Sequence, residues 1–151
     1  MVWAPNPARD DAGNVLPHDD PVTLPSEWTL IRHVHREQWH QDGRRPQSIA
    51  FSFSSGGSHS MSVDVERPML VAGLASTHYA FLAGKGAVRI TARKARELGM
   101  RVGPEPVDGN PHHGGIWEPN PAVSGKELGR RIRELSRSCE VVARGPNGIA
   151  T

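Results

Sequence analysis

The sequence predicts a single α+β domain, built from a small, mostly antiparallel sheet with two helices packed on one side. Apolar and polar residues alternate at 28–35, 49–53 and 61–65, which is the pattern of half-buried strands. Helix signals follow near 92–98 and 125–137. The repeated strand, helix, strand spacing of a doubly wound parallel sheet is missing from the chain.

The most regular strand pattern predicts a hairpin over 48–66. Its arms would be 49–53 and 61–65, joined by the sequence SSGGS, which has the glycine content of a tight turn. The outward face of this hairpin would carry small polar side chains, namely Ser48, Ser52, Ser54, Ser60, Ser62 and Asp64. A face so poor in bulk is either exposed to water or the floor of a cleft.

Four further segments carry apolar residues in short runs. The run 69–76 fits either a strand or a short helix, whereas 78–83 is typical of a buried strand. Short strands are also predicted at 100–103 and 140–144. Together these segments would complete the sheet.

Both predicted helices have capping signals. Thr91 precedes 92–98 as an N-cap, and Gly99 follows it where a left-handed cap falls. Ser124 and Glu127 form a Ser-x-x-Glu capping box for 125–137. Apolar residues then recur along one face of that helix, at Leu128, Ile132 and Leu135.

The segment from 107 to 121 is predicted to be a loop. Its glycines and prolines disfavour a helix or a central strand, because proline lacks a donor and glycine costs conformational entropy. The segment carries Asp108, Asn110, His112, His113, Trp117 and Glu118, which can transfer protons, bind a ligand or stack on a ring. We therefore expect 108–120 to form one wall of a functional site.

Length and composition indicate one domain with a modest core, since 36% of the 151 residues are hydrophobic. We expect a disordered or draped arm at 1–25, the domain at 26–146 and a tail at 147–151. No apolar run reaches the roughly 18 residues that span a bilayer, and no signal-peptide pattern is present. These features favour a cytoplasmic protein without membrane association. Cys139 is the only cysteine, which excludes a disulfide framework.

Charge is unevenly distributed although the net charge is only +2. From Lys85 to Arg144 there are twelve Lys or Arg and seven Asp or Glu. This excess indicates either an ordinary solvated surface or a face for an acidic partner, such as a nucleotide or RNA.

Histidine is enriched, with eight residues in the chain. His33 and His35 would share one face of a strand, and His112 and His113 lie in the loop. Such imidazoles can bind a metal, exchange protons as acid and base, or simply pack. No established metal motif such as HExxH is present, so no metal ligands are assigned, and the cofactor stays open.

The order of short motifs resembles a family of small bacterial proteins without an assigned activity. The motifs are Leu30-Ile31-Arg32, SIAFS at 48–52, Ser62-Val63-Asp64, and NPHHGGI at 110–116 before a basic helix. The chain is also distantly similar to small ADP-ribosyltransferase toxins. That resemblance rests on an early Arg, a Ser-rich strand and a later acid, and Arg32, Ser52 and Glu118 would fill these places.

Our leading hypothesis is a small enzyme, a hydrolase or transferase, that acts on RNA or a nucleotide through histidine acid-base chemistry. Catalytic candidates are His33, His35, His112, His113 and Glu118, and substrate-binding candidates are Arg32, Asp108, Asn110 and Trp117. The alternative is a non-catalytic binding module that contacts an acidic or protein partner through 108–120. Trp3 or Trp117 would anchor a protein partner.

Overall fold

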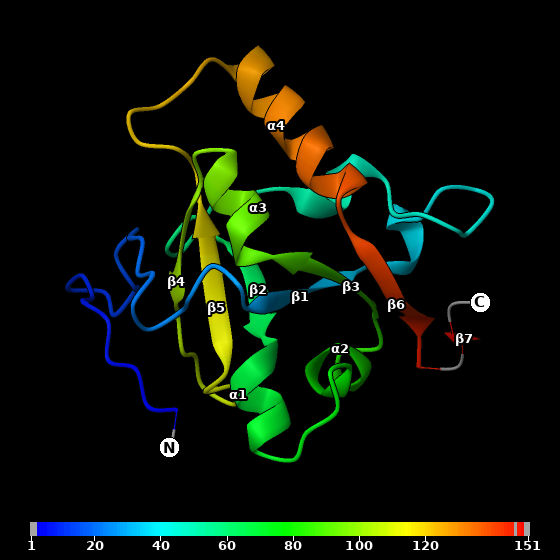
Figure 1. Ribbon diagram of the computed structural model, residues 1–151, viewed down its shortest axis with the longest axis horizontal. Helices are drawn as coiled ribbons and strands as arrows, with labels where there is room; N and C mark the ends of the chain where they lie inside the picture. The colour runs from blue at the N-terminus through cyan, green and yellow to red at the C-terminus, as the bar shows by residue number, and fades with distance from the viewer. Residues whose placement is uncertain (1–2, 147, 150–151) are drawn as a thin grey trace.

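The computed structural model describes residues 3–146 and 148–149, and its strands form one antiparallel sheet. The strands are β1 (Thr29–Val34), β2 (Met61–Val65), β3 (Gly86–Thr91), β4 (Arg101–Pro104), β5 (His113–Trp117), β6 (Glu140–Gly145) and β7 (Gly148–Ile149). Their order across the sheet is β4-β5-β2-β1-β3-β6-β7 (Figure 1). The predicted α+β class is therefore confirmed. The predicted tail falls outside the described residues, apart from β7.

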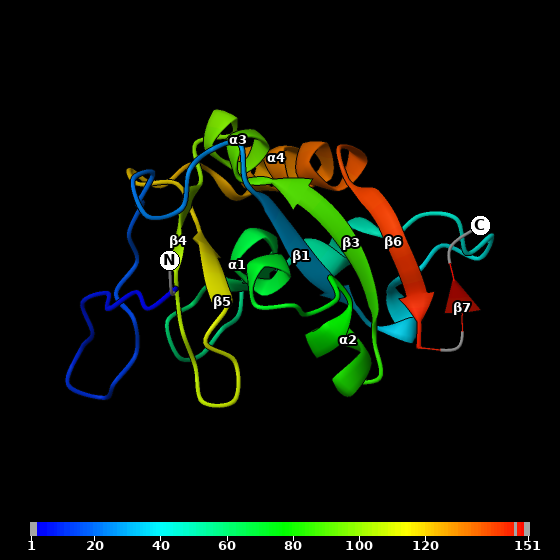
Figure 2. The same ribbon diagram turned by 60° about the horizontal axis from the view of Figure 1, so that its bottom comes forward.

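Within the described residues, six helical segments accompany the sheet. They are α1 (Glu66–Val71), α2 (His78–Leu82), α3 (Ala92–Glu97), α4 (Gly125–Arg137) and the 3-10 turns η1 (Arg36–Gln38) and η2 (Ser48–Phe51). Figures 1 and 2 show α3 and α4 together at one side of the molecule and α2 at the other. None of the helices in the described part of the chain has the length and apolar character needed to cross a membrane.

The two predicted helices are present with their caps. The Thr91 hydroxyl accepts a hydrogen bond from the Lys94 amide, and the Ser124 hydroxyl accepts one from the Glu127 amide. Gly99 has a φ of +79°, the left-handed conformation that ends α3. Local sequence signals were sufficient here because each cap satisfies backbone groups within one turn.

Alternation along β1 divides the apolar residues between two faces. Leu30 and Val34 point into the larger core, which also contains Ala95 of α3 and Leu135 of α4. Ile31 points the opposite way and packs with Ala80 of α2 and with Ala87. The sheet is thus covered on both faces, with the larger core beneath α3 and α4.

The predicted hairpin over 48–66 is wrong in its first arm. Ser48–Phe51 forms η2, in which Phe51 is fully buried while Ile49 is 61% exposed. The second arm is β2, which pairs with β1 on one edge and β5 on the other. Alternation alone cannot separate a strand from a short 3-10 turn whose buried side chain reaches the core.

The predicted loop at 107–121 is also wrong, because β5 runs through it in the interior of the sheet. Its glycines permit close approach rather than a turn. A Cβ on Gly114 would lie 2.9 Å from Val65 Cγ2, and one on Gly115 would lie 2.7 Å from the Trp117 ring. The glycines are therefore required by close side-chain packing against Val65 of β2 and Trp117 of β5.

The segment 78–83 was predicted to be a strand and instead contains the helix α2. Only Ala80 is buried in this helix, and Leu82 is 75% exposed, which is the one-sided burial of a short surface helix. The uncertain run 69–76 begins within α1. Pro68 lies in the first turn of α1, where its missing donor costs nothing.

Residues 3–25 lie along the outer edge of β4. The Asp20 amide donates to the Val102 carbonyl at 2.9 Å, and the Val102 amide donates to Asp19 Oδ1 at 2.8 Å. Leu24 is fully buried in the larger core, and the His18 ring packs on Trp117 with centroids 5.0 Å apart. The arm thus occupies the hydrogen-bonding groups of an edge strand.

A buried ion pair joins the start of α1 to β3. Arg89 donates to both carboxyl oxygens of Glu66, at 2.8 and 2.7 Å, and Thr29 and Ser76 donate to the same group. Burial would raise the pKa of the Glu66 carboxyl, but these hydrogen bonds and the Arg89 charge outweigh it and lower the pKa from 4.5 to about 2. This carboxylate therefore stabilises the folded state when it is ionised.

The depressed pKa of Glu66 predicts acid sensitivity. The stabilisation is complete above the unfolded-state pKa and is lost as the pH falls from about 5 to about 2. Glu66→Gln should lower the free energy of unfolding at pH 7 by about 2–3 kcal/mol and flatten its decline in acid. Urea unfolding across this pH range measures both effects. The control is Glu97→Gln on the exposed face of α3, and an equal loss in that variant would contradict the assignment.

The close packing around β5 predicts an effect of a single methyl group. Gly115→Ala should lower the free energy of unfolding by about 1–3 kcal/mol, because the new Cβ meets the rigid, buried Trp117 ring. Gly129→Ala in α4 is the matched control. Its Cβ meets only the flexible end of Arg133, so it should stabilise by about 0.5–1 kcal/mol. The same sign of change in both variants, measured by chemical denaturation, would refute this account.

Candidate functional site

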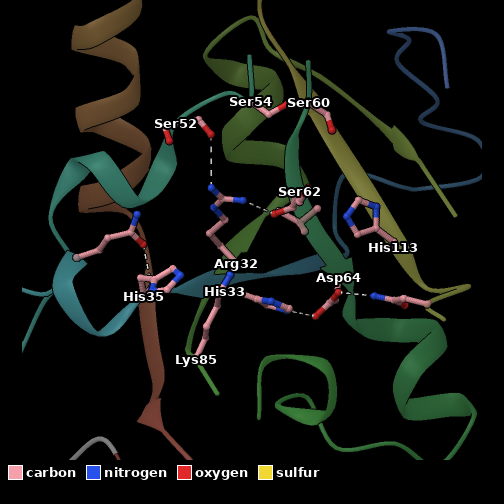
Figure 3. A pocket seen from close by; sticks show the side chains of 13 residues that line it. Arg32, His33, His35, Ser52, Ser54, Ser60, Ser62, Asp64, Lys85 and His113 are labelled. Carbon is pink, nitrogen blue, oxygen red and sulfur yellow. Dashed lines mark hydrogen bonds and ion pairs between the residues drawn. The ribbon is translucent and has the colours of Figure 1, made fainter. Parts of the chain in front are cut away.

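A cleft opens where β1 and β2 separate. These strands pair only at Leu30 with Val65 and at Ile31 with Asp64, and beyond this point they diverge. The resulting cleft has a volume of about 340 Å³ (Figure 3). Its polar lining is Arg32, His33, His35, Gln38, Ser52, Ser54, Ser60, Ser62, Asp64, Lys85, Asn110 and His113.

The Arg32 guanidinium lies at the point where the strands separate. It donates to the carbonyls of Ala50 at 2.8 Å, Ser62 at 2.7 Å and Ser52 at 3.4 Å. Burial lowers the pKa of Arg32 to about 10, which still leaves it charged at neutral pH. This side chain therefore satisfies one carbonyl of β2 and two carbonyls at the end of η2, and it places a positive charge at the cleft.

His33 forms the first of two fixed imidazoles in the cleft. Its Nε2 lies 2.6 Å from Asp64 Oδ2, and the other carboxyl oxygen of Asp64 accepts a hydrogen bond from Asn110 Nδ2 at 2.8 Å. Asp64 is only 1% exposed, so its negative charge is shielded from water and directed at the imidazole. The ionised carboxylate can only accept, so the His33 proton lies on Nε2 and Nδ1 is the basic nitrogen.

His113 is the second fixed imidazole. Its Nδ1 donates to the Glu105 carbonyl at 2.7 Å, and a carbonyl can only accept. In the neutral ring the lone pair is therefore on Nε2. The buried Glu105 side chain accepts hydrogen bonds from the Ser58 and Ser60 hydroxyls and lies 3.5 Å from His113 Nδ1. Strand β5 thus brings an oriented histidine to the cleft.

The remaining polar groups are less constrained. His35 is exposed just after β1, and Lys85 precedes β3 as a half-buried side chain. Both contribute donors to the lining, together with the exposed hydroxyls of Ser52 and Ser62. These are groups that a ligand can engage without breaking the contacts that hold the fold.

The structure brings some predicted site residues together and separates others. Arg32, His33, His35, Asn110 and His113 all line the cleft. The serine row of 52, 54, 60 and 62 lines it as well, so the floor of a cleft is the better of the two interpretations given to that row. The other four predicted residues, His112, Trp117, Glu118 and Asp108, are absent from its lining.

Trp117 was predicted to be a stacking ring or a partner anchor, and its burial contradicts this. It is 1% exposed, and its Nε1 donates to the Ser58 carbonyl at 3.0 Å. Both Ile116 and Trp117 of β5 are buried, and the His18 ring of the arm packs on Trp117. Trp3, the other predicted anchor, is half-buried, because its ring packs on Trp28 and its Nε1 donates to the Pro111 carbonyl.

His112, Asp108 and Glu118 are placed outside the cleft for different reasons. His112 is buried, and its Nδ1 lies 2.8 Å from the Tyr79 hydroxyl. Burial lowers the pKa of His112, and the nearby His78 lowers it further, whereas Asp64 opposes this. Asp108 lines a separate open pocket beside Arg9, and Glu118 is exposed just after β5. His112 is therefore buried away from the cleft, although its neighbour His113 lines it.

Four cleft or supporting residues were not predicted to belong to the site, namely Gln38, Asp64, Lys85 and Glu105. Asp64 had a signal, because it is the only carboxylate in the polar row of the 61–65 strand. Lys85 and Glu105 had none, since each lies beside a strand end and reaches the site only through the pairing of β3 with β1 and of β4 with β5. Within residues 3–146 and 148–149, no group of three or more His, Cys, Asp or Glu is arranged to hold a metal ion.

Comparison of the chain with known protein families, with curated proteins and with solved structures finds no match. The geometry of the cleft is therefore the main source of information about its chemistry.

The position of His112 predicts a structural role. His112→Ala should lower the free energy of unfolding by about 1–3 kcal/mol, because it leaves a buried space and a Tyr79 hydroxyl without its partner. Tyr79→Phe should cost less, and the double variant should cost less than the sum of the two. Exposed His40→Ala should change stability by less than about 0.5 kcal/mol. If the losses of stability in His112→Ala and Tyr79→Phe were additive in the double variant, the hydrogen bond between the two side chains would be excluded.

Proposed function

We propose that the chain is an enzyme that acts on a phosphate-bearing substrate, RNA or a nucleotide, in the cleft between β1 and β2. One observation carries the proposal. Two imidazoles from different strands, His33 and His113, line the same cleft, and each has one nitrogen fixed by a buried acceptor. Such a pair can serve as base and acid in one reaction.

The charged side chains that line the cleft favour an anionic substrate. Arg32 and Lys85 contribute positive charge to the cleft. Asp64 is the single carboxylate of the lining, and its two oxygens already accept from His33 and Asn110. A phosphate group can therefore approach the lysine and the free hydroxyls without facing an unpaired carboxylate.

The fixed nitrogens suggest how protons would move. For a phosphodiester of RNA, one imidazole removes the proton of the 2′-hydroxyl as its oxygen attacks phosphorus. The bond from phosphorus to the 5′-oxygen breaks, and the other imidazole, in its protonated form, donates a proton to that oxygen. His33 suits the base role, because Asp64 stabilises the imidazolium that forms. Lys85 would offset charge on the phosphate oxygens.

A second candidate is ADP-ribosyl transfer from a dinucleotide. The observation that favours it is the contact between Arg32 Nη2 and the Ser52 carbonyl, since two of the three positions of the toxin resemblance meet in the cleft. The third position, Glu118, lies outside it. An acid in this reaction would have to be Asp64, which lines the cleft, or Glu105, which is buried behind the lining residues Ser60 and His113.

The alternative is a non-catalytic module that binds a partner through 108–120. Because β5 lies inside the sheet, little of this segment is exposed for such binding. Trp117 is buried, so the surface that this segment offers a partner lies mainly at its two ends, near Asp108 and Glu118. Binding of a nucleotide in the cleft without turnover would favour a module of a different kind, one that uses the cleft itself.

Turnover assays on the purified protein test the proposal. Short RNA, nucleotides and NAD are offered separately, and product formation is followed by chromatography. We expect His33→Gln and His113→Gln each to reduce the rate by about 10²–10⁴, with a smaller loss for Asp64→Asn. Glu97→Gln, at an exposed position of α3 outside the cleft, is the control and should retain the full rate.

The assay separates the candidates. Cleavage of RNA or a nucleotide supports the acid-base proposal, and release of nicotinamide from NAD supports the second candidate. An unchanged rate in the folded His33→Gln and His113→Gln proteins would overturn the roles of both imidazoles. Circular dichroism and thermal unfolding of each variant verify that the fold is retained.

A further inference from the structure

We infer that the substrate is a single-stranded RNA that continues from the cleft across residues 39–48 into a second, basic groove beside α4. The inference rests on the proposed function for the reacting end of the RNA. The groove itself is an independent feature of the structure. It has a volume of about 490 Å³ and lies between the 40–48 segment and the C-terminal half of α4.

The chemistry of the groove fits phosphate oxygens. Its lining includes His40, Arg45, Arg133 and Arg137, together with the hydroxyl-bearing Ser48 and Ser136, and no carboxylate lines it. Arginine donors and hydroxyls are the groups that hold nucleic acid backbones in position. The one apolar residue among those that line it is Pro46, which is itself buried, so the groove offers no exposed aromatic or aliphatic anchor of the kind that a protein partner would require.

The arginines that line the groove have fewer or longer ion pairs than Arg130 and Arg131 of α4, which lie outside it. Arg130 and Arg131 both pair with Glu127 and lie outside the groove. Arg133 and Arg45 are exposed and have no ion-pair partner in the part of the chain that the structure describes. Arg137 has only a long contact of 3.7 Å to Glu134. The charges in the groove are therefore available to an external anion.

The segment that carries Arg45 is held in a defined shape. Trp39 and Pro46 form a bridge, and within it the His40 amide donates to the Arg45 carbonyl at 2.9 Å. Asp42 accepts from the Arg44 amide, so this carboxylate is committed to the turn. The arginine is thus presented from a structured loop, which reduces the entropy that binding must overcome.

The cleft and the groove adjoin the same short segment. Gln38 and Ser52 line the cleft, whereas His40 and Ser48 line the groove. Ser48 and Ser52 are separated by η2, a distance of about 8 Å at the rise of a 3-10 helix. Figure 1 shows this segment, in cyan, beside the C-terminal end of α4. A chain of a few nucleotides can bridge the two sites, whereas a mononucleotide occupies only one.

The test compares a single-stranded RNA of roughly ten nucleotides with a mononucleotide. Fluorescence anisotropy gives the affinity for the RNA at several salt concentrations, and calorimetry gives the affinity for adenosine monophosphate. We expect Arg45→Ala and Arg133→Ala each to weaken RNA binding by roughly tenfold and to reduce the salt slope by about 0.7. Neither variant should change mononucleotide binding. Arg130→Ala removes the same charge from the same helix outside the groove and should leave RNA affinity within about twofold.

Each outcome has a defined meaning. Equal losses in Arg130→Ala and Arg133→Ala would overturn the groove, since they would indicate general charge attraction. Mononucleotide binding without tighter RNA binding would overturn the groove and retain the proposed function. RNA binding through the groove without turnover would retain the groove and overturn the proposed function. No binding of either ligand would overturn both.

Discussion

The buried Arg32 guanidinium is the interaction on which the site depends. Two antiparallel strands that separate leave carbonyls without partners, and burying such groups costs free energy. Arg32 donates to one such carbonyl, that of Ser62 in β2, and also to the carbonyls of Ala50 and Ser52 at the end of η2, so none of the three is left without a partner. The same charge is then present at the cleft. One side chain thus links the shape of the site to its electrostatic character.

The two imidazoles show how a sheet can orient reactive groups. His33 comes from β1 and His113 from β5, with β2 between them in the strand order. β2 supplies Asp64 to the first histidine, and the Glu105 carbonyl just after β4 holds the second. Each ring is therefore fixed by an acceptor from a neighbouring part of the sheet, and the tautomer of each follows from that acceptor. Asn110 supports the arrangement by fixing the second oxygen of Asp64.

Sequence patterns predicted the elements whose signals are local. The caps at Thr91 and Ser124 act within one turn, so α3 and α4 were found close to their observed limits. β5 was missed, because its glycines are required by Val65 and Trp117 and not by a turn. The site was predicted only in part, because sequence patterns do not show which strands pair. Arg32, His33, His35, Asn110 and His113 carry recognisable chemistry, whereas Lys85 and Glu105 become relevant only once strand pairing is known.

The arm at residues 3–25 has a consequence for how the protein behaves in solution. An uncovered edge strand is a template on which another chain can add a strand. Asp19 and Asp20 occupy the backbone groups of Val102 in β4 and thereby block such addition at this edge. A shortened chain that begins near residue 26 would expose those groups. Dimers or aggregates formed by such a chain would report the loss of a protective cover and would reveal nothing about the natural assembly.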